Sequence, residues 1–274
     1  MPFGKRLGIL GMGRMGRCLA QGLISQKTIE PHQMSFSTRH LETRAQATHD
    51  LGLKAAVSNL ELVKNSDLIV LAVKPQNMLE VLREIGPALG KGKTLISIVA
   101  SVSTTDIETE IAKGTAVLRA MPNTPAFVGA GMTALCAGKS AAESDLKMAK
   151  EIFKSIGKVL LVDEKHMDAV TGLSGCGPAY LYVVLESLTD AGIKVGLSRD
   201  VATQLAGQTV LGAAQMLLET GRHPAALKDE VTTPAGCTID GLLELEEGKL
   251  RVTLIKAVVQ ATKRAKALAK KAKV

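Results

Sequence analysis

The stretch Leu7-Gly8-Ile9-Leu10-Gly11-Met12-Gly13-Arg14-Met15-Gly16 lies close to the start of the chain and decides the fold. A short apolar run leads into the pattern G-x-G-x-x-G, and a helix is predicted over Arg14–Gln26. A strand, a glycine turn and a helix in this order are the context that a dinucleotide-binding fingerprint requires. Gly11 would permit the tight turn, Gly13 would let backbone approach a pyrophosphate, and Gly16 would let the helix pack closely on the strand. The stretch predicts a dinucleotide site and leaves the substrate open.

The composition is that of a large core made of aliphatic and small residues. Of the 274 residues 46% are hydrophobic and only 2% are aromatic, and the mean hydropathy is +0.18. A chain of this length is expected to form two domains. It contains no apolar run near the ~20 residues that span a bilayer. No secretion signal is expected, because Lys5 and Arg6 are not followed by an apolar segment with a cleavage site.

The four cysteines are isolated in the sequence. They are Cys18, Cys136, Cys176 and Cys237, and no two of them form a C-x-x-C pair. Isolated thiols are typical of a reducing compartment, so we expect a cytoplasmic protein. Since none has the spacing of a metal ligand, no metal site is predicted.

The net charge of +8 comes mostly from one segment. Residues 263–274 contain no acid and hold six cations, namely Lys263, Arg264, Lys266, Lys270, Lys271 and Lys273. We interpret this segment as the solvated end of a helix. The alternative is a basic, non-catalytic binding protein on a dinucleotide-type scaffold, with the tail contacting nucleic acid. Trp is absent and there are only two Tyr, which leaves little for base stacking, so we expect neither nucleic-acid nor membrane binding.

Between residues 34 and 162, short apolar runs alternate with helical stretches. The strands are predicted at Met34–Ser37, Ala55–Val57, Asp67–Val73, Thr94–Ile98, Val117–Met121, Met132–Cys136 and Val159–Val162. The helices between them are predicted at Leu41–Leu51, after Ser58 or Asn59, and at Asn77–Ile85, Thr104–Ile111 and Glu143–Ile156. This alternation indicates βαβ units and an α/β fold with a doubly wound, Rossmann-type domain over residues 1–164.

The strand pattern ends near Lys165, and the remaining sequence is helical. Long helices are predicted at Pro178–Gly192, Arg199–Glu219 and Leu250–Ala272. The first two are apolar over most of their surface, which suggests burial against a partner. We therefore expect residues 165–274 to form an all-α dimerisation domain.

The ends of the predicted strands indicate where the dinucleotide lies. An NAD-specific fold would place an acid near the end of Met34–Ser37. Here Thr38, Arg39 and His40 follow, without an acid before Glu42. Hydroxyls and a guanidinium suit a 2′-phosphate, so NADP is favoured over NAD; the alternative is an ordinary polar loop. The segments Ala72-Val73-Lys74-Pro75 and Met121-Pro122-Asn123-Thr124-Pro125 also follow strands and are expected on the ligand side.

Two segments of the helical half are unusual. Gly172-Leu173-Ser174-Gly175-Cys176-Gly177-Pro178-Ala179-Tyr180 is a glycine-rich stretch immediately before a helix. Asp229–Ile239 is a hydroxyl-rich turn that also opens a helix. Amides at a helix N-terminus with Thr hydroxyls beside them would hold a carboxylate. The alternative is simple helix capping by Thr.

Taken together, these motifs resemble pyrroline-5-carboxylate reductase, the enzyme of the last step of proline biosynthesis. The matching residues are Gly11–Gly16, Ala72–Pro75, Met121–Pro125, Gly172–Tyr180, and Thr232–Ile239 followed by Gly241. The chain departs from the family pattern in having Cys176 where Ser is common. It also has Thr232-Thr233-Pro234-Ala235-Gly236 where Ser-Ser-Pro-Gly-Gly is common.

The resemblance implies hydride transfer from NAD(P)H, with NADPH preferred, to the imine carbon of a five-membered ring that bears a carboxylate. Thr238 would be the catalytic residue, hydrogen-bonding the imine nitrogen. Thr233 and the amides of Gly236 and Cys237 would hold the carboxylate, and Ser174 is placed with them as a substrate-binding residue. The family also implies a homodimer, frequently assembled into a larger ring.

The fingerprint, the strand ends and the resemblance together give one cofactor-binding set. It consists of Gly11, Met12, Gly13, Arg14, Met15, Gly16, Ser37, Thr38, Arg39, Asn59, Ala72, Val73, Lys74, Pro75 and Asn123. The closest rival is a β-hydroxyacid dehydrogenase, whose family resembles G-x-x-G-x-G-x-x-x-K at the start of the equivalent helix. Leu181 occupies the Lys position here. An alcohol oxidation needs a base, which leucine does not provide.

Overall fold

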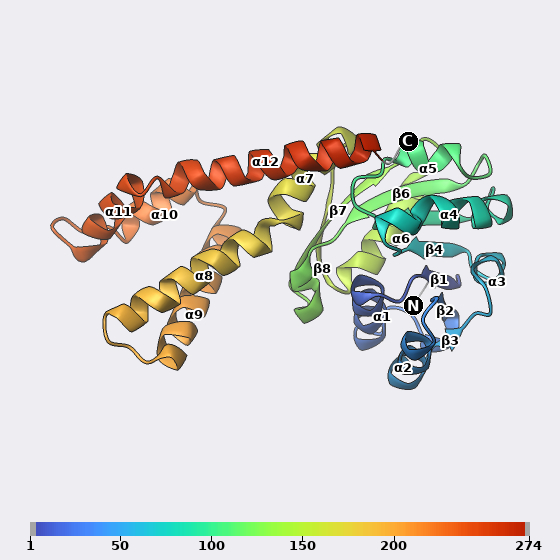
Figure 1. Ribbon diagram of the computed structural model, residues 1–274, viewed down its shortest axis with the longest axis horizontal. Coiled ribbons are helices and arrows are strands. Elements are labelled where there is room, and N and C mark those ends of the chain that lie inside the picture. The colour runs from blue at the N-terminus through green and yellow to red at the C-terminus, as the bar shows by residue number, and fades with distance from the viewer. Residues whose placement is uncertain (1–3, 272–274) are drawn as a thin grey trace. The chain divides into compact units, whose positions relative to one another are not determined.

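The computed structural model describes residues 4–271 and the side chains of these residues up to residue 269 (Figure 1). Its contacts divide the chain into two compact units. The first consists of Met1–Gly175 together with Gln260–Val274, and the second of Cys176–Val259. The predicted boundary between residues 164 and 165 falls within the first unit, because the short helices that follow the last strand belong to it.

The first unit is built on one eight-stranded sheet with the order β3-β2-β1-β4-β5-β6-β7-β8. The strands are β1 Leu7–Leu10, β2 Met34–Ser37, β3 Lys54–Ala55, β4 Leu68–Leu71, β5 Thr94–Ser97, β6 Ala116–Met121, β7 Gly131–Ala137 and β8 Gly157–Leu161. The first six strands are parallel and follow the doubly wound order, with the topological switch between β1 and β4. The predicted Rossmann-type α/β fold is therefore confirmed.

Strand β7 differs from the predicted βαβ alternation. It runs antiparallel to β6, and β8 runs parallel to β7. Only the short 3-10 helix η3, Thr124–Val128, lies between β6 and β7. A parallel crossover needs a dozen or more residues, usually with a helix, so this short connection returns the chain antiparallel.

Helices cover the sheet (Figure 1), and their buried side chains form two separate hydrophobic cores with it. The helices of the first unit are α1 Arg14–Ser25, α2 Leu41–Leu51, α3 Asn59–Lys64, α4 Pro75–Ile85, α5 Thr104–Thr109, α6 Glu143–Lys154 and α7 Met167–Val170. One core joins α1, α2 and α6 to the sheet and contains Phe36 and Phe153. The other joins α3, α4 and α5 and contains Leu82 and Ile107. Strands β1 and β4 are buried along their whole length, which explains their continuous apolar sequences.

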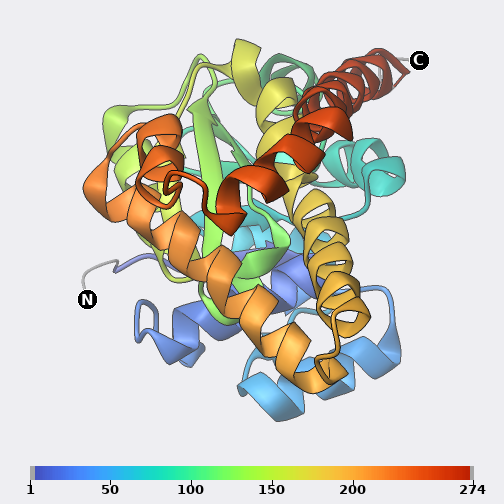
Figure 2. The same ribbon diagram turned by 90° about the vertical axis from the view of Figure 1, so that its left-hand side faces the viewer.

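The second unit is helical. Its helices are α8 Gly177–Lys194, α9 Arg199–Thr220, α10 Pro224–Glu230, α11 Cys237–Glu247 and the first part of α12 Leu250–Lys271. Helix α8 packs against α9 (Figure 2). A side chain at Gly192 would lie 2.8 Å from the Ala202 methyl group, so the glycine allows this close approach.

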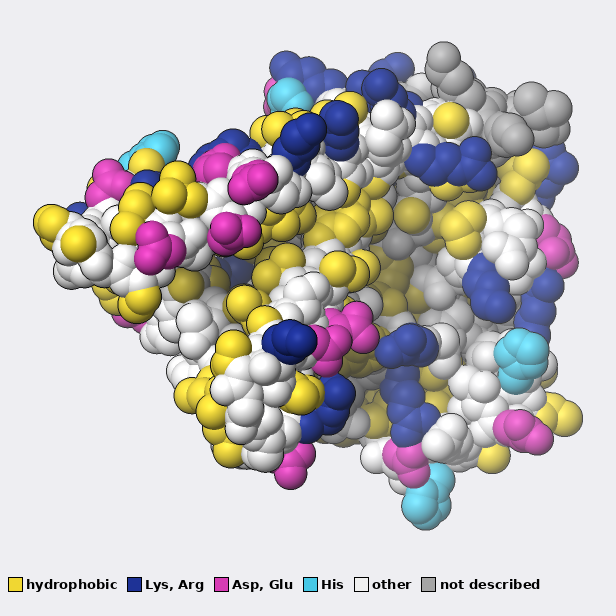
Figure 3. All heavy atoms as spheres, turned by 60° about the vertical axis from the view of Figure 1, so that its left-hand side comes forward, with side chains coloured by type: hydrophobic (Ala, Val, Ile, Leu, Met, Phe, Trp, Pro, Cys, Tyr) yellow, Lys and Arg dark blue, Asp and Glu magenta, His cyan; other side chains and the backbone are white. Residues whose placement is uncertain are grey.

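Large hydrophobic side chains are exposed on these helices, and Figure 3 shows many of them in yellow. They include Leu181, Tyr182, Val183, Leu205, Leu211, Leu243 and Ile255. An apolar surface of this extent is typical of a protein interface.

The basic segment lies largely on α12. Lys263, Arg264 and Lys266 are exposed, as a solvated helix face requires. Ala272, Lys273 and the side chains of Lys270 and Lys271 lie outside the described part of the chain. Among the helices of residues 4–271, none combines the length and apolar character that crossing a membrane demands.

Candidate functional site

The turn between β1 and α1 is held against the ends of two neighbouring strands. Gly11 has φ +98° and donates its amide to the Ser37 carbonyl oxygen at 2.9 Å. The Ala72 amide donates to the Leu10 carbonyl oxygen at 2.8 Å. A Cβ on Gly11 would lie 2.7 Å from the Ala72 oxygen. Both the backbone angle and the close approach therefore require glycine here.

The other two fingerprint glycines serve different purposes. A Cβ on Gly16 would lie 2.2 Å from the Gly11 oxygen, so this glycine is required by packing inside the protein. A Cβ on Gly13 would meet no protein atom within 4 Å, and Gly13 is exposed. It is the N-cap of α1, and no side chain caps that helix end. The first-turn amides are thus left for an anionic group, as the pyrophosphate of a dinucleotide demands.

A cavity of about 180 Å³ lies at the ends of β1, β2 and β4, beside this turn. Its lining includes ten of the predicted cofactor residues: Gly11, Met12, Gly13, Ser37, Thr38, Arg39, Asn59, Ala72, Val73 and Lys74. His40, Asn77 and Val81 complete the lining. These residues fit a dinucleotide, since glycine backbone, hydroxyls and cations meet where the sheet reverses its order.

The polar groups around this cavity are linked to two acids of α4. The Ser37 hydroxyl donates to Asn59 Oδ1 at 2.6 Å, and Asn59 Nδ2 donates to Glu84 Oε2 at 2.7 Å. Arg39 pairs with Glu80, with 2.8 Å between Nη2 and Oε1. No acid directly follows β2, and the acids that contact these residues come from a helix distant in the sequence. No local motif marks Glu80 or Glu84.

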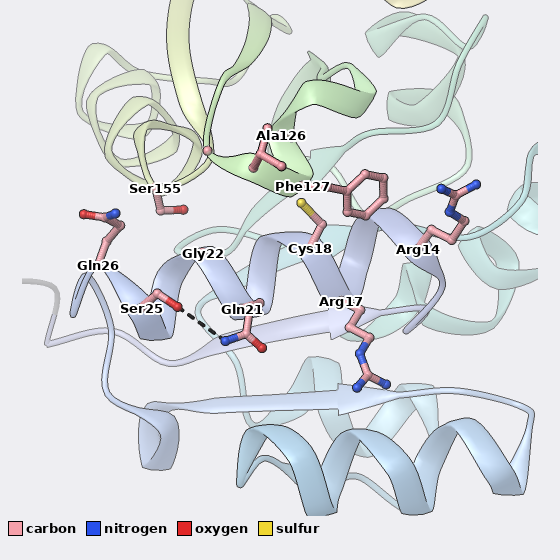
Figure 4. A pocket seen from close by; sticks show the side chains of 12 residues that line it. Arg14, Arg17, Cys18, Gln21, Gly22, Ser25, Gln26, Ala126, Phe127 and Ser155 are labelled. Carbon is pink, nitrogen blue, oxygen red and sulfur yellow. Dashed lines mark hydrogen bonds between the residues drawn. The ribbon is translucent and has the colours of Figure 1, made fainter. Parts of the chain in front are cut away.

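Five residues of the predicted cofactor set lie outside this cavity lining: Arg14, Met15, Gly16, Pro75 and Asn123. Arg14 lines a separate groove of about 490 Å³ between α1 and η3 (Figure 4). Its guanidinium lies 5.2 Å from the centre of the Phe127 ring. The role of Arg14 in cofactor binding stays a prediction.

Asn123 is engaged with the protein itself. Its Oδ1 accepts a hydrogen bond from the Met132 amide at 2.8 Å. Its Nδ2 donates to the carbonyl oxygen of Ser174 at 3.2 Å and lies 3.4 Å from the Ser174 hydroxyl. Asn123 thus ties the start of β7 to the segment that carries Ser174.

The segment that carries Ser174 has a regular backbone conformation. Thr171–Gly175 forms a turn of π-helix that continues α7 and leads into α8. Turns of this kind are frequent at functional sites. A Cβ on Gly175 would lie 2.7 Å from the Met121 methyl group, so the segment packs closely on the end of β6.

A buried charge cluster precedes this segment in the chain, and it has no local signature in the sequence. Arg119 on β6 is only 4% exposed and lies 3.6 Å from Glu164 and 3.8 Å from Asp168. Glu164 also accepts a hydrogen bond from the Thr104 amide at 2.6 Å. Burial raises the pKa of the neighbouring Cys136 thiol to about 12, and the Glu164 charge contributes. The cluster fixes the chain just before the π-helical turn.

The threonine segment of the second unit forms a tight turn at the start of α11. The Gly236 amide donates to the Thr233 carbonyl oxygen at 3.0 Å, and Ala235 has φ +57°. The turn therefore uses the Gly236 amide itself, and the role of Gly236 in substrate binding stays a prediction. The amides of Cys237 and Thr238 lie in the first turn of α11, where no carbonyl of the helix reaches them.

No side chain caps α11, whose N-cap is Gly236. The hydroxyl of Thr232 instead donates to the Lys228 carbonyl oxygen at 2.8 Å. Capping by Thr, the alternative interpretation of this segment, does not occur. Thr238 is half-buried, and Thr233 and Cys237 are exposed. The helix N-terminus therefore offers amides and hydroxyls to an anionic group.

Metal chemistry has no candidate residues in the described part of the chain. Within residues 4–271, no group of three or more His, Cys, Asp or Glu side chains is arranged to hold a metal ion.

Comparison with known proteins identifies the family. The soybean (Glycine max) pyrroline-5-carboxylate reductase is 43% identical over 262 residues, which cover 96% of this chain and 95% of that protein. The chain belongs to the pyrroline-5-carboxylate reductase family. Residues 164–268 match the family model described as pyrroline-5-carboxylate reductase dimerisation. Residues 6–101 match the model described as NADP oxidoreductase, coenzyme F420-dependent.

Solved structures of pyrroline-5-carboxylate reductases share the whole fold. The Coxiella burnetii enzyme has a TM-score of 0.91 at 35% identity and covers 97% of this chain and 99% of its own. The Plasmodium falciparum enzyme, solved with NADP bound, has a TM-score of 0.88 at 35% identity and covers 97% and 98%. The match to the dimerisation model agrees with the helical dimerisation region expected from the sequence. The NADP oxidoreductase model and the NADP-bound relative agree with the expected NADP(H) cofactor.

Proposed function

We propose that this protein reduces L-1-pyrroline-5-carboxylate to L-proline with NADPH, the last step of proline biosynthesis; NADH would serve less well. The proposal rests on two features that occur together in this chain. One is the dinucleotide turn at Gly11–Gly16, and the other is the uncapped N-terminus of α11 with Thr238 in its first turn. The chain also matches the soybean pyrroline-5-carboxylate reductase over 95% of that protein's length. The reduced nicotinamide supplies the hydride.

The protein's own residues bind and orient the substrate. The first-turn amides of Cys237 and Thr238 and the hydroxyl of Thr233 hold the ring carboxylate. The Thr238 hydroxyl hydrogen-bonds the ring nitrogen and so fixes which carbon faces the hydride donor. Ser174, whose carbonyl oxygen accepts a hydrogen bond from Asn123, is proposed as a further substrate-binding residue. Positioning of this kind supplies much of the rate when the reactants are already activated.

The proton balance needs no strong acid from the protein. A protonated imine accepts the hydride at carbon, the C=N π electrons move to nitrogen, and a neutral secondary amine results. A threonine hydroxyl is too weak an acid to protonate the imine, so its role is orientation. The rate should therefore depend on the fraction of the imine that enters in its protonated form.

The assembly proposed for this family member is a homodimer built through residues 165–274, further assembled into a larger homo-oligomer. The exposed hydrophobic side chains of α8 and α9 support burial against a second copy. We infer a cytoplasmic location from the isolated cysteines, and we expect neither a nucleic acid nor a membrane as partner.

The test is Thr238→Ala, assayed by NADPH oxidation with pyrroline-5-carboxylate. We expect kcat/KM to fall about 100-fold, as on loss of a hydrogen bond that acts at the reacting centre. NADPH affinity should be unchanged. The control is Thr220→Ala, which removes a hydroxyl that donates to the Met216 carbonyl oxygen within α9. Wild-type kcat/KM in Thr238→Ala would exclude the role given to Thr238.

A further inference from the structure

The Arg39–Glu80 pair lies at the edge of the cofactor cavity, where the adenosine ribose is expected. Arg39 lines the cavity, and Glu80 lies on α4 between two other lining residues, Asn77 and Val81. The two side chains are 54% and 69% exposed, and their charged ends are 2.8 Å apart. The pair is thus accessible from solvent, and the Arg39 guanidinium already forms an ion pair with the Glu80 carboxylate.

We propose that Glu80 is a specificity-determining residue that sets how strongly the protein prefers NADPH over NADH. It does so by competing with the cofactor's 2′-phosphate for the Arg39 guanidinium. The inference rests on NADP(H) being the cofactor, and it adds a residue that lies outside the fingerprint and outside the loop after β2.

Two electrostatic effects oppose the 2′-phosphate when Glu80 is ionised. Arg39 has to give up or share its carboxylate partner in order to contact the phosphate. A phosphate monoester also carries between one and two negative charges near neutral pH, and its oxygens would approach the Glu80 carboxylate. Both effects lower the affinity for NADPH. NADH has a hydroxyl in place of the phosphate, so neither effect acts on it.

The neighbouring acid Glu84 is used differently. Its carboxylate accepts a hydrogen bond from the Asn59 side-chain amide, and Asn59 Oδ1 accepts a hydrogen bond from the Ser37 hydroxyl. Glu84 therefore orients Asn59 and Ser37, whereas Glu80 faces the cation. The two acids lie one helical turn apart on α4, and only Glu80 forms an ion pair with Arg39.

The size of the effect follows from the exposure of the pair. An ion pair this exposed contributes little because solvent screens it, and the direct repulsion of the phosphate adds to its effect. Removing the Glu80 charge should therefore tighten NADPH binding by about threefold to tenfold. Removing the Arg39 charge should weaken NADPH binding by about tenfold or more.

The experiment measures dissociation constants of NADPH and NADH for the full-length protein, without the imine substrate. The variants are Glu80→Gln, Arg39→Gln and the double variant. The control is Glu42→Gln, which removes an exposed acid three residues from Arg39 along the chain. Adenosine 2′,5′-bisphosphate and 5′-AMP serve as smaller probes that differ only in the 2′-phosphate. Because no turnover is measured, the result is independent of the reaction assigned to the protein.

The expected result is tighter binding of NADPH and of the bisphosphate in Glu80→Gln, with the constants for NADH and 5′-AMP unchanged. The Glu42→Gln control should show a smaller effect. In the Arg39→Gln background, Glu80→Gln should tighten NADPH binding by less than it does with Arg39 present, because the competition acts through Arg39 and only the direct repulsion of the phosphate remains. The proposal is overturned if Glu80→Gln leaves NADPH binding unchanged or tightens NADH equally. It is also overturned if the full gain persists without Arg39.

Discussion

Replacing Gly13 and Gly16 by alanine separates a glycine required by the cofactor from one required by the fold. A Cβ at residue 16 would lie 2.2 Å from the Gly11 carbonyl oxygen, and ordinary contacts of this kind are longer than 3.0 Å. The helix or the turn would have to move by almost an ångström. Overpacking of this kind costs about 1–3 kcal/mol. For a chain of this size, the loss corresponds to a fall in Tm of about 2–6 °C.

Gly13→Ala should behave in the opposite way. Its Cβ would meet no protein atom within 4 Å, so the free energy of unfolding should change by less than about 1 kcal/mol, the weak cost of alanine at an N-cap. The methyl group would instead lie where the pyrophosphate approaches the backbone. We expect the dissociation constant of NADPH to rise at least about tenfold.

Calorimetric melting and a fluorescence titration with NADPH, applied to both variants, provide the two readouts. The reasoning is refuted if Gly13→Ala melts well below the wild type with unchanged NADPH affinity. A wild-type Tm for Gly16→Ala would refute it as well, because the close approach to the Gly11 oxygen would then not destabilise the fold.

Three further predictions concern stability. Ala235 has φ +57°, a backbone angle that strains alanine and suits glycine, so Ala235→Gly should raise the free energy of unfolding by about 0.5–1 kcal/mol. Urea titration measures this, and an unchanged free energy of unfolding would show that the backbone at Ala235 is not strained. Lys93→Met should lower it by about 1–3 kcal/mol, because Lys93 Nζ donates to the carbonyl oxygens of Val63 and Ser66 at 2.7 and 2.6 Å. Burial raises the pKa of the Cys136 thiol to about 12 from an ordinary value of 9.0, so the unfolded thiol ionises first. Stability should therefore fall as the pH rises above 9, by up to about 1.4 kcal/mol per pH unit, and this slope should be shallower in Cys136→Ala.

The sequence predicted the parts of the fold that depend on local patterns. The continuous apolar run within Asp67–Val73 indicated a central parallel strand, and the glycine spacing at Gly11–Gly16 indicated the turn and the helix. Ten residues of the predicted cofactor set line one cavity because the ends of parallel strands meet at one edge of the sheet. These features follow from periodicity and topology, which a single sequence contains.

Other features depend on pairings between distant residues. The antiparallel direction of β7 depends on a nine-residue connection that contains only a short 3-10 helix. The pairing of Arg39 with Glu80 joins residues 41 positions apart in the chain. The buried position of Arg119 between Glu164 and Asp168 likewise has no local signature. The use of the Gly236 amide in the Thr233 turn depends on a backbone angle at Ala235 that the alanine side chain would not suggest.

The most direct test of the proposed reaction follows the transferred hydride. The purified protein would be incubated with pyrroline-5-carboxylate and NADPH deuterated at the reactive position of the nicotinamide, and the product would be examined by mass spectrometry and NMR. The account predicts one proline formed per NADPH oxidised, with one deuterium on the ring carbon that was double-bonded to nitrogen. Absence of proline with both NADPH and NADH, or proline without deuterium at that carbon, would contradict it.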